Sequence, residues 1–217
     1  MKNLIAFLNS SVGRKLLMAL SGLFLCSFLV VHLTINLFLL ESDAGATYDA
    51  YAEFMATYPL IRPIEWILFG GFLLHMLFGV ILWWYNRKAR PKGYSVNRAS
   101  DSSTLSSRVM IWTGGFVLVF LVVHINTFFI QSRFFPTGKP MYEMVADAFK
   151  NPWNDAFYVV AIAFLAYHLL HGFQSSFQTF GLRNPKYKKL IDVVGVIFWL
   201  LIPLGFAAMP IYFYLAH

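Results

Sequence analysis

Five long apolar segments decide what this chain can fold into. They cover roughly residues 14–40, 62–86, 108–131, 153–180 and 189–215, in a chain that is 59% hydrophobic and only 12% charged. Each has the roughly 20 residues that an α-helix needs to cross the hydrocarbon core of a bilayer. They lack the alternation of barrel strands, and only helices or closed barrels satisfy their backbones in lipid. We therefore predict an all-α integral membrane protein, a single domain over residues 1–217 with five transmembrane helices.

Charge is distributed unevenly between the connecting loops. Thirteen of the 17 basic residues lie at the N-terminus, in the second loop or in the last loop, whereas most acidic residues lie in the other loops. The positive-inside rule therefore predicts a cytoplasmic N-terminus and an external C-terminus. The net charge of +7 reports this topology, and because it lies in short loops it does not indicate a nucleic-acid-binding domain.

The first four apolar segments form an internal repeat. The sequence FLVVH ends at His32 and again at His124, 92 residues later, and His75 is answered by His168 after 93 residues. The other matched residues are Gly79 with Gly172, Ser21 and Gly22 with Thr113 and Gly114, and Tyr48, Ala52 and Glu53 with Tyr142, Ala146 and Asp147. Helices one and three are therefore equivalent, as are helices two and four, while the fifth lies outside the repeat.

The four repeated histidines are candidate metal ligands. An ionisable residue inside a bilayer is costly and points to function, and neutral imidazole is a common metal ligand. Counting 1.5 Å per residue places His32 and His124 at one level near the outer surface, and His75 and His168 at a deeper level. A haem iron needs axial ligands from opposite sides at equal depth, which a four-helix bundle can supply. We predict two haem b groups, ligated by His32 with His124 and by His75 with His168. Proton relay or hydrogen-bonded packing is the alternative.

Other residues fit this arrangement. Gly79 and Gly172 follow their histidines by one turn, where the missing side chain leaves room for a porphyrin edge. Ser21 and Thr113 lie near the level of the inner haem. His171 is either a haem-propionate or hydrogen-bonding partner or a polar packing residue. Four basic residues at the cytoplasmic edge either pair with propionates or anchor helix ends: Arg14, Lys15, Arg108 and Arg183.

The pattern resembles the cytochrome b membrane anchor of succinate:quinone oxidoreductases (succinate dehydrogenase and fumarate reductase), in the version with one five-helix subunit and two haems. The resemblance rests on one histidine in each of the first four segments, the two His-x-x-x-Gly patterns and the acidic stretch Tyr48-Asp-Ala-Tyr-Ala-Glu-Phe-Met55. It implies that a flavoprotein subunit and an iron–sulfur subunit dock on the cytoplasmic face of a bacterial inner membrane. Electrons would then pass between succinate and a quinone, menaquinone or ubiquinone, through the haems.

Glu53 is the candidate for proton exchange with the quinone, because a carboxylate at the mouth of the bundle can serve a site bounded by lipid. Asp147 is the weaker candidate by repeat symmetry. The alternative for Glu53 is an ordinary solvated loop carboxylate.

A quinone site at the cytoplasmic interface, near Ser11, Arg14 and Arg108, is an alternative that the sequence leaves open. Two other functions also stay open: a dihaem cytochrome serving a hydrogenase, a formate dehydrogenase or a cytochrome b561-like ascorbate reductase, and a proton-relay transporter without haem.

Overall fold

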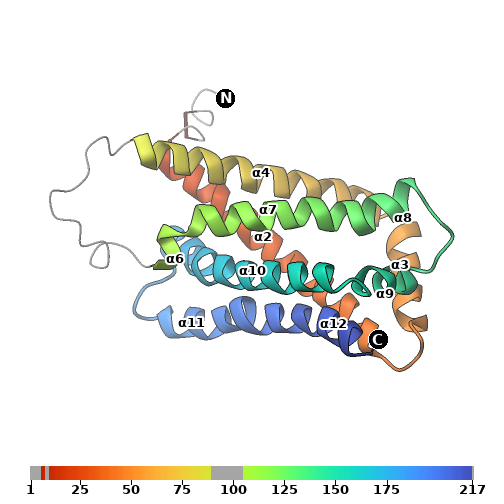
Figure 1. Cartoon of the computed structure of the whole chain (residues 1–217). Helices are drawn as coiled ribbons and strands as arrows, with labels where there is room; N and C mark the ends of the chain where they lie inside the picture. Colours follow the sequence, from red (N-terminus) through yellow and green to blue (C-terminus); the bar gives the residue numbers. More distant parts are fainter. Residues whose placement is uncertain (1–5, 8–9, 89–104, 217) are drawn as a thin grey trace.

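The computed structural model describes residues 6–7, 10–88 and 105–216 (Figure 1). Four of the 13 basic residues that define the predicted topology, and the C-terminal histidine, lie outside the described residues: Lys2, Arg90, Lys92, Arg98 and His217. Within these ranges five helices are long and apolar enough to cross a membrane: Ser11–Leu40, Ile61–Lys88, Met110–Phe134, Pro152–Thr179 and Lys188–Ala216. No strand occurs in the part of the chain that is described. The predicted all-α membrane fold is confirmed.

The five spans are built from helices with clear boundaries. The first consists of α2 (Ser11–Leu37) and the 3₁₀ turn η1 (Phe38–Leu40), the second is α4 (Ile61–Lys88), and the fourth is α10 (Pro152–Thr179). The third joins α7 (Met110–His124), the π-helical segment η2 (Ile125–Ile130) and α8 (Gln131–Phe134), after the short α6 (Leu105–Arg108). The fifth joins α11 (Lys188–Val196), the π-helical segment η3 (Ile197–Leu201) and α12 (Ile202–Ala216).

The N-terminal ends of two spans have capping side chains. The Ser10 hydroxyl accepts a hydrogen bond from the backbone N–H of Gly13 at 3.0 Å, which starts α2. The Asn151 side chain accepts one from the N–H of Trp153 at 3.0 Å, and Pro152 occupies the first turn of α10. Both arrangements satisfy N–H groups that the first turn leaves without a helical partner.

The first four spans form a four-helix bundle. Helix α2 packs along α4 and α10, and α10 also packs along α7, whereas α4 touches α7 only briefly. It follows that α2 and α7 lie on one diagonal of the bundle, and α4 and α10 on the other. Repeat-equivalent helices thus occupy opposite corners, as a pseudo-two-fold axis along the bundle requires. The fifth span packs against α10 and α2 on the outside (Figure 1).

Two short helices cover one end of the bundle where the sequence analysis expected external loops. They are α3 (Ala46–Thr57) and α9 (Met141–Phe149), and they pack against each other. The backbone N–H of Tyr142 donates to the Asp49 carboxylate at 2.8 Å. Gly45 has a left-handed backbone, φ 86°, and the Tyr142 ring lies where a Cβ would project, so glycine is needed at this junction.

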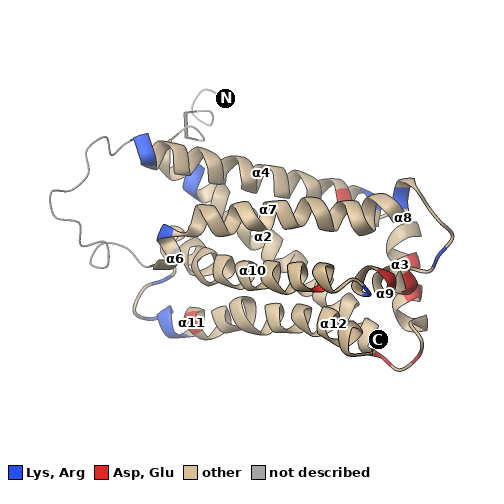
Figure 2. Cartoon of the chain, in the orientation of Figure 1, with Lys and Arg blue, Asp and Glu red and all other residues tan. Residues whose placement is uncertain are grey.

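Charge separates along the bundle (Figure 2). The described lysines and arginines gather at the end that holds the start of α2, the end of α4 and the α10–α11 connection, which we call the basic end. The other end, with the acidic helices α3 and α9, is called the acidic end, although it also carries four basic residues: Arg62, Arg133, Lys139 and Lys150.

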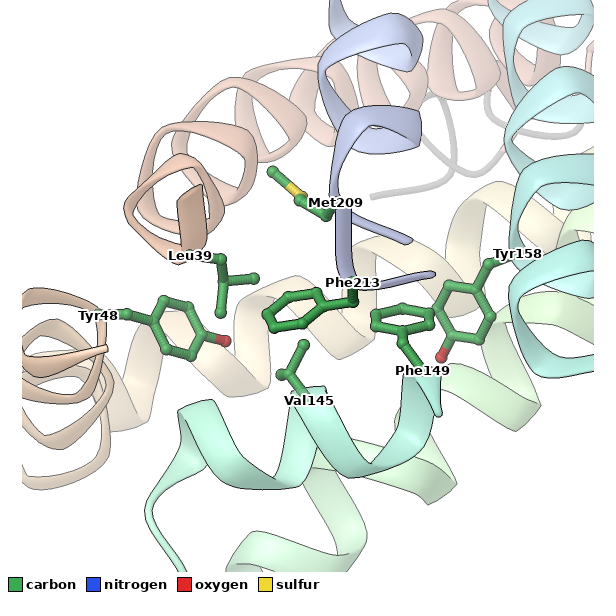
Figure 3. Close-up of a cluster of buried hydrophobic side chains, with 7 residues drawn as sticks. All are labelled: Leu39, Tyr48, Val145, Phe149, Tyr158, Met209 and Phe213. Carbon is green, nitrogen blue, oxygen red and sulfur yellow. The ribbon is translucent and has the colours of Figure 1, made fainter. Parts of the chain in front are cut away.

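The acidic end contains a compact apolar cluster (Figure 3). It joins η1, α3, α9, α10 and α12 through Leu39, Tyr48, Val145, Phe149, Tyr158, Met209 and Phe213. A second cluster, made by Cys26, Leu169, Phe173 and Ile191, joins α2, α10 and α11. Cys26, the one cysteine in the sequence, is therefore a packing residue. Together the two clusters fix α10 at the centre of the molecule.

Candidate functional site: two facing histidine pairs

His32 and His124 face each other across the α2–α7 diagonal. Their ring centres are 5.8 Å apart and the ring planes are inclined by 84°. Each imidazole stacks on a phenylalanine one turn earlier in its own helix, Phe28 at 5.1 Å and Phe120 at 5.4 Å. These phenylalanines are themselves repeat equivalents, and their rings restrict how the imidazoles can turn. We call His32 and His124 the acidic-end pair.

His75 and His168 face each other across the other diagonal, from α4 and α10. Their ring centres are 6.1 Å apart and the planes are inclined by 75°. We call them the basic-end pair. The structure thus brings together the two histidine pairs that were expected from their equal depths in the membrane, one pair on each diagonal.

The separations within both pairs suit two imidazoles on one iron. Two metal–nitrogen bonds of about 2 Å, plus about 1 Å from each nitrogen to its ring centre, put the centres about 6 Å apart. Direct hydrogen bonding between the rings would bring the centres to about 5 Å. Among the described residues, no group of three or more His, Cys, Asp or Glu side chains could hold a bare metal ion. Pairs of ligands suit haem, because the porphyrin supplies the other four nitrogens itself.

Hydrogen bonds at Nδ1 also fit ligation. A metal-bound imidazole normally uses its second ring nitrogen in a hydrogen bond that fixes the orientation of the ring. Two of the four histidines have a contact that allows Nδ1 to donate, both at 3.3 Å: His75 with Ser21 Oγ and His124 with Tyr158 Oη. His32 differs, because the Asn36 amide nitrogen, 3.3 Å from its Nδ1, can only donate, and it also donates to the His32 backbone oxygen at 2.8 Å. The fourth, His168, has a buried Nδ1 without a partner in the structure.

Small residues determine how closely the helices approach the basic-end pair. A Cβ added to Gly22 would lie 3.2 Å from Cε1 of His75, and one added to Gly114 would lie 3.2 Å from Cε1 of His168. The sequence analysis matched these glycines in the repeat but gave them no role. Gly79 and Gly172, expected to leave room for a porphyrin edge, face methionine methyl groups instead, Met18 at 3.6 Å and Met110 at 3.4 Å. These two methionines are also repeat equivalents, and flexible thioethers can move aside.

The remaining residues expected near the inner haem lie in different surroundings. Ser21 contacts His75 as described, whereas the buried Thr113 donates to the backbone oxygen of Met110 at 3.0 Å and does not reach His168. His171 is half-buried and lies within the electrostatic reach of Arg183.

Two arginines expected at the cytoplasmic edge differ in exposure. The Arg14 guanidinium lies 4.0 Å from the ring centre of Tyr85, and its buried Nε has no partner. Arg108 is exposed on α6.

Glu53 and Asp147 differ sharply although they are repeat equivalents. Glu53 is exposed on α3, and its carboxylate has no hydrogen bond or ion pair with any described residue. Asp147 pairs with Lys139 at 2.7 Å and with Lys150 at 2.6 Å. Hydrogen bonds from these two lysines lower the pKa of Asp147 to about 2. Asp147 is therefore ionised throughout the neutral range and is a poor proton carrier.

Sequence reasoning missed the polar residues that contact the acidic-end pair. Asn36 lies one turn after His32, so its helical spacing could have indicated the contact. Tyr158 reaches His124 from another helix, and no local pattern predicts that contact. The charge pattern counts Asp155 only as one of the acidic residues on the external side, but the structure buries it to 6% exposure in the first turn of α10.

Fold and site together define an all-α membrane protein whose core presents two facing pairs of histidines. The model of the succinate dehydrogenase/fumarate reductase transmembrane subunit family matches residues 85–204, which is 120 of the 217 residues. The chain belongs to this family. The matched region includes His124 and His168 together with most of the fifth span. Searches of curated proteins and of solved structures found no match.

Proposed function

We propose that this protein is a dihaem cytochrome b anchor that carries electrons between a cytoplasmic flavin and iron–sulfur dehydrogenase and a membrane quinone. The proposal rests on the two facing histidine pairs, one on each diagonal of the bundle. The ring centres are 5.8 Å apart in the acidic-end pair and 6.1 Å apart in the basic-end pair. Family membership favours succinate or fumarate as the substrate of the assembled complex, over the hydrogenase, formate and ascorbate systems. The chemistry on that substrate belongs to the partner subunits, since this subunit is the transmembrane one.

The protein's own contribution is to hold and orient the ligands. Haem, when bound, supplies one-electron chemistry at each of two depths in the membrane. His32 and His124 would hold one haem, and His75 and His168 the other. Tyr158 and Ser21 restrain two of the imidazoles, His124 and His75, through their Nδ1 atoms. Hydrogen bonds of this kind and the surrounding apolar side chains are the means by which a protein adjusts a haem potential.

The two ends of the bundle then have different tasks. The positive-inside rule favours a cytoplasmic basic end, where the flavoprotein and iron–sulfur subunits would dock, and we propose a bacterial inner membrane as its setting. Arg14 at this end has an unpartnered buried Nε, which suits a propionate carboxylate. His171 and Arg108 are further candidates for such contacts.

Quinone chemistry is assigned to the acidic end, because electrons from the cytoplasmic side reach the acidic-end pair last. Quinone reduction consumes protons as well as electrons, so a carboxylate that can titrate is required nearby. Glu53 is the better candidate of the two repeat equivalents, because its carboxylate is free whereas Asp147 is held by two lysines.

Haem quantitation tests the proposal directly. The purified membrane subunit, isolated with whatever soluble subunits accompany it, should contain two b-type haems per chain by pyridine haemochrome assay. Its spectrum should show low-spin iron with two imidazole ligands. One haem or none per chain would contradict the dihaem proposal, and complete absence of haem would favour a proton-relay transporter.

A further inference from the structure

Asp155 differs from the other polar residues that are buried as whole residues in the described part of the chain, because its side chain has no hydrogen-bond partner. Three polar residues are buried there: Thr113, Asp155 and Ser176. The hydroxyl groups of Thr113 and Ser176 each donate to a backbone oxygen in their own helix, both at 3.0 Å. Both carboxylate oxygens of Asp155 are buried and unpartnered.

No capping contact or ion pair satisfies this carboxylate. Asp155 lies in the first turn of α10, where the helix dipole favours a negative charge, but the capping position is filled by Asn151, whose side chain accepts from the Trp153 N–H. A carboxylate removed from water without a counter-charge is costly. Its proton occupancy is for that reason sensitive to any change of charge in its neighbourhood.

The equivalent position in the first half of the internal repeat holds a different set of residues. At an offset of 93 residues, Asp155 and Tyr158 correspond to Arg62 and Glu65 at the start of α4. Those two residues neutralise each other in an ion pair of 2.7 Å. The second half of the chain has no ion pair at this position and holds an unpaired acid there.

Asp155 lies between the acidic end and the acidic-end histidine pair. Tyr158 follows Asp155 by three residues, so it lies on the same face of α10 and about 4.5 Å deeper. The Tyr158 hydroxyl lies 3.3 Å from Nδ1 of His124. The order from the surface inward is thus a carboxyl group, a phenol and a histidine of the redox site.

We propose that Asp155 binds a proton when the acidic-end redox site gains an electron, and releases it when that electron leaves. The inference rests on the proposed haem at this pair. One electron enters the site, one proton from water at the acidic end converts the carboxylate to the carboxylic acid, and the local net charge stays the same. The electron is supplied by the dehydrogenase partner and removed by the quinone. Charges interact far more strongly here than in bulk water, which couples the two events.

Several other titratable groups lie on the elements packed against this end of α10. They are Tyr158 on α10 itself, His32 on α2, His124 on α7, Asp147 and Lys150 on α9, and Tyr212 on α12. Asp147 and Lys150 are paired with each other. None of these groups forms a hydrogen bond or ion pair with the Asp155 carboxylate.

Redox titration of the whole complex at several pH values tests the inference. Full coupling of one proton to one electron lowers the midpoint potential by about 59 mV for each pH unit, a tenfold change in proton concentration. The acidic-end haem of the wild type should show a substantial part of this slope. Asp155→Asn keeps the size but cannot titrate, so the slope should be lost while both haems remain bound. Asp155→Glu should restore the slope, and Glu143→Gln, which removes an exposed carboxylate from α9, should leave it unchanged.

The outcomes separate this inference from the proposed function. A wild type without haem would overturn both. A haem-containing Asp155→Asn variant with the wild-type slope would overturn the role of Asp155 alone. If Asp155→Asn fails to assemble, infrared difference spectra of the wild type test whether Asp155 becomes protonated on reduction. Reduction should then produce a carboxylic acid band that shifts when aspartate is isotope-labelled, and the lack of such a band would overturn the inference.

Discussion

The hydroxyl of Ser21 lies 3.3 Å from Nδ1 of His75, and it also donates a hydrogen bond to the backbone oxygen of Met18 at 3.1 Å. Because its proton is directed to Met18, the Ser21 oxygen is free to accept from the imidazole N–H. Thr113, at the same place in the second repeat, bonds only to its own helix. The two ligands of the basic-end pair therefore differ in the hydrogen bonding that sets the basicity of an imidazole.

Replacing Ser21 by alanine should raise the midpoint potential of the basic-end haem. An imidazole that donates from Nδ1 is a stronger electron donor to iron, so losing the acceptor favours the reduced state. Removal of such a partner typically weakens binding by about 10- to 100-fold, so some haem should also be lost. Potentiometric titration checks the shift.

Ser21→Thr keeps the hydroxyl and should behave as the wild type, while Thr113→Ala should change the potential much less. Equal shifts in Ser21→Ala and Thr113→Ala would show that the contact with His75 is not responsible.

Alanine at His75 or at His168 should remove the basic-end haem and lower the haem content from two to one per chain. Each provides one imidazole of a facing pair, and a single remaining ligand cannot hold the iron from both sides. His171→Ala should retain both haems, since His171 has no ring contact with either pair in the structure. Pyridine haemochrome assays of the three variants measure the number of haems per chain and so test these expectations. Loss of a haem in His171→Ala together with retention in His168→Ala would reverse the choice between these neighbours.

Periodicity and charge were sufficient to predict the membrane fold. Runs of apolar residues gave the five spans to within a few residues, because helices in lipid must be long and apolar whatever they pack against. The repeat paired His32 with His124 and His75 with His168, because equal offsets imply equal depths in equivalent helices. The helices α3 and α9 were not predicted, since their short segments are polar on one side and stabilised by mutual packing.

The internal symmetry did not predict how the two halves of the repeat differ. Repeat symmetry treats Glu53 and Asp147 alike, yet Lys139 and Lys150 neutralise only the second. Repeat symmetry also makes Arg62 and Asp155 equivalent, yet Arg62 forms an ion pair whereas the Asp155 carboxylate has no partner. The ion pairs of Arg62 with Glu65 and of Asp147 with Lys150 have i,i+3 spacing, so a local comparison of the two halves could have indicated them. The burial of Asp155 depends on the helices packed around it, and no local spacing encodes it.

Glu53→Gln should slow quinone turnover by about 10²-fold or more, the usual effect of losing a positioned acid or base. Glutamine keeps the size and hydrogen-bonding capacity but cannot titrate. Haem content and succinate oxidation with artificial dyes should be unchanged, because neither needs proton exchange at the acidic end. Parallel loss of dye and quinone activities would indicate misfolding instead.

Asp147→Asn is the matched comparison for Glu53→Gln. Lys139 and Lys150 hold the pKa of Asp147 at about 2, so this group does not exchange protons near neutral pH. Quinone turnover should therefore stay close to the wild-type rate. If Glu53→Gln retained full quinone activity, Glu53 would be an ordinary surface carboxylate, and variants of Ser11, Arg14 and Arg108 would then test a quinone site at the basic end.

Neighbouring glycines in α7 allow a test of how closely the basic-end pair is packed. A Cβ on Gly114 would lie 3.2 Å from Cε1 of His168, whereas one on exposed Gly115 would meet nothing within 4 Å. Both Gly→Ala changes stabilise an isolated helix by a similar amount, about 0.5–1 kcal/mol, so their difference isolates the contact with the imidazole.

Gly114→Ala should displace the His168 ring by a few tenths of an ångström. It should therefore alter the low-spin spectrum and reduce haem occupancy, while Gly115→Ala keeps the wild-type spectrum. Gly22→Ala should reproduce the effect from the other side of the pair, at His75, and identical spectra for all three variants would show that these glycines do not position the ligands.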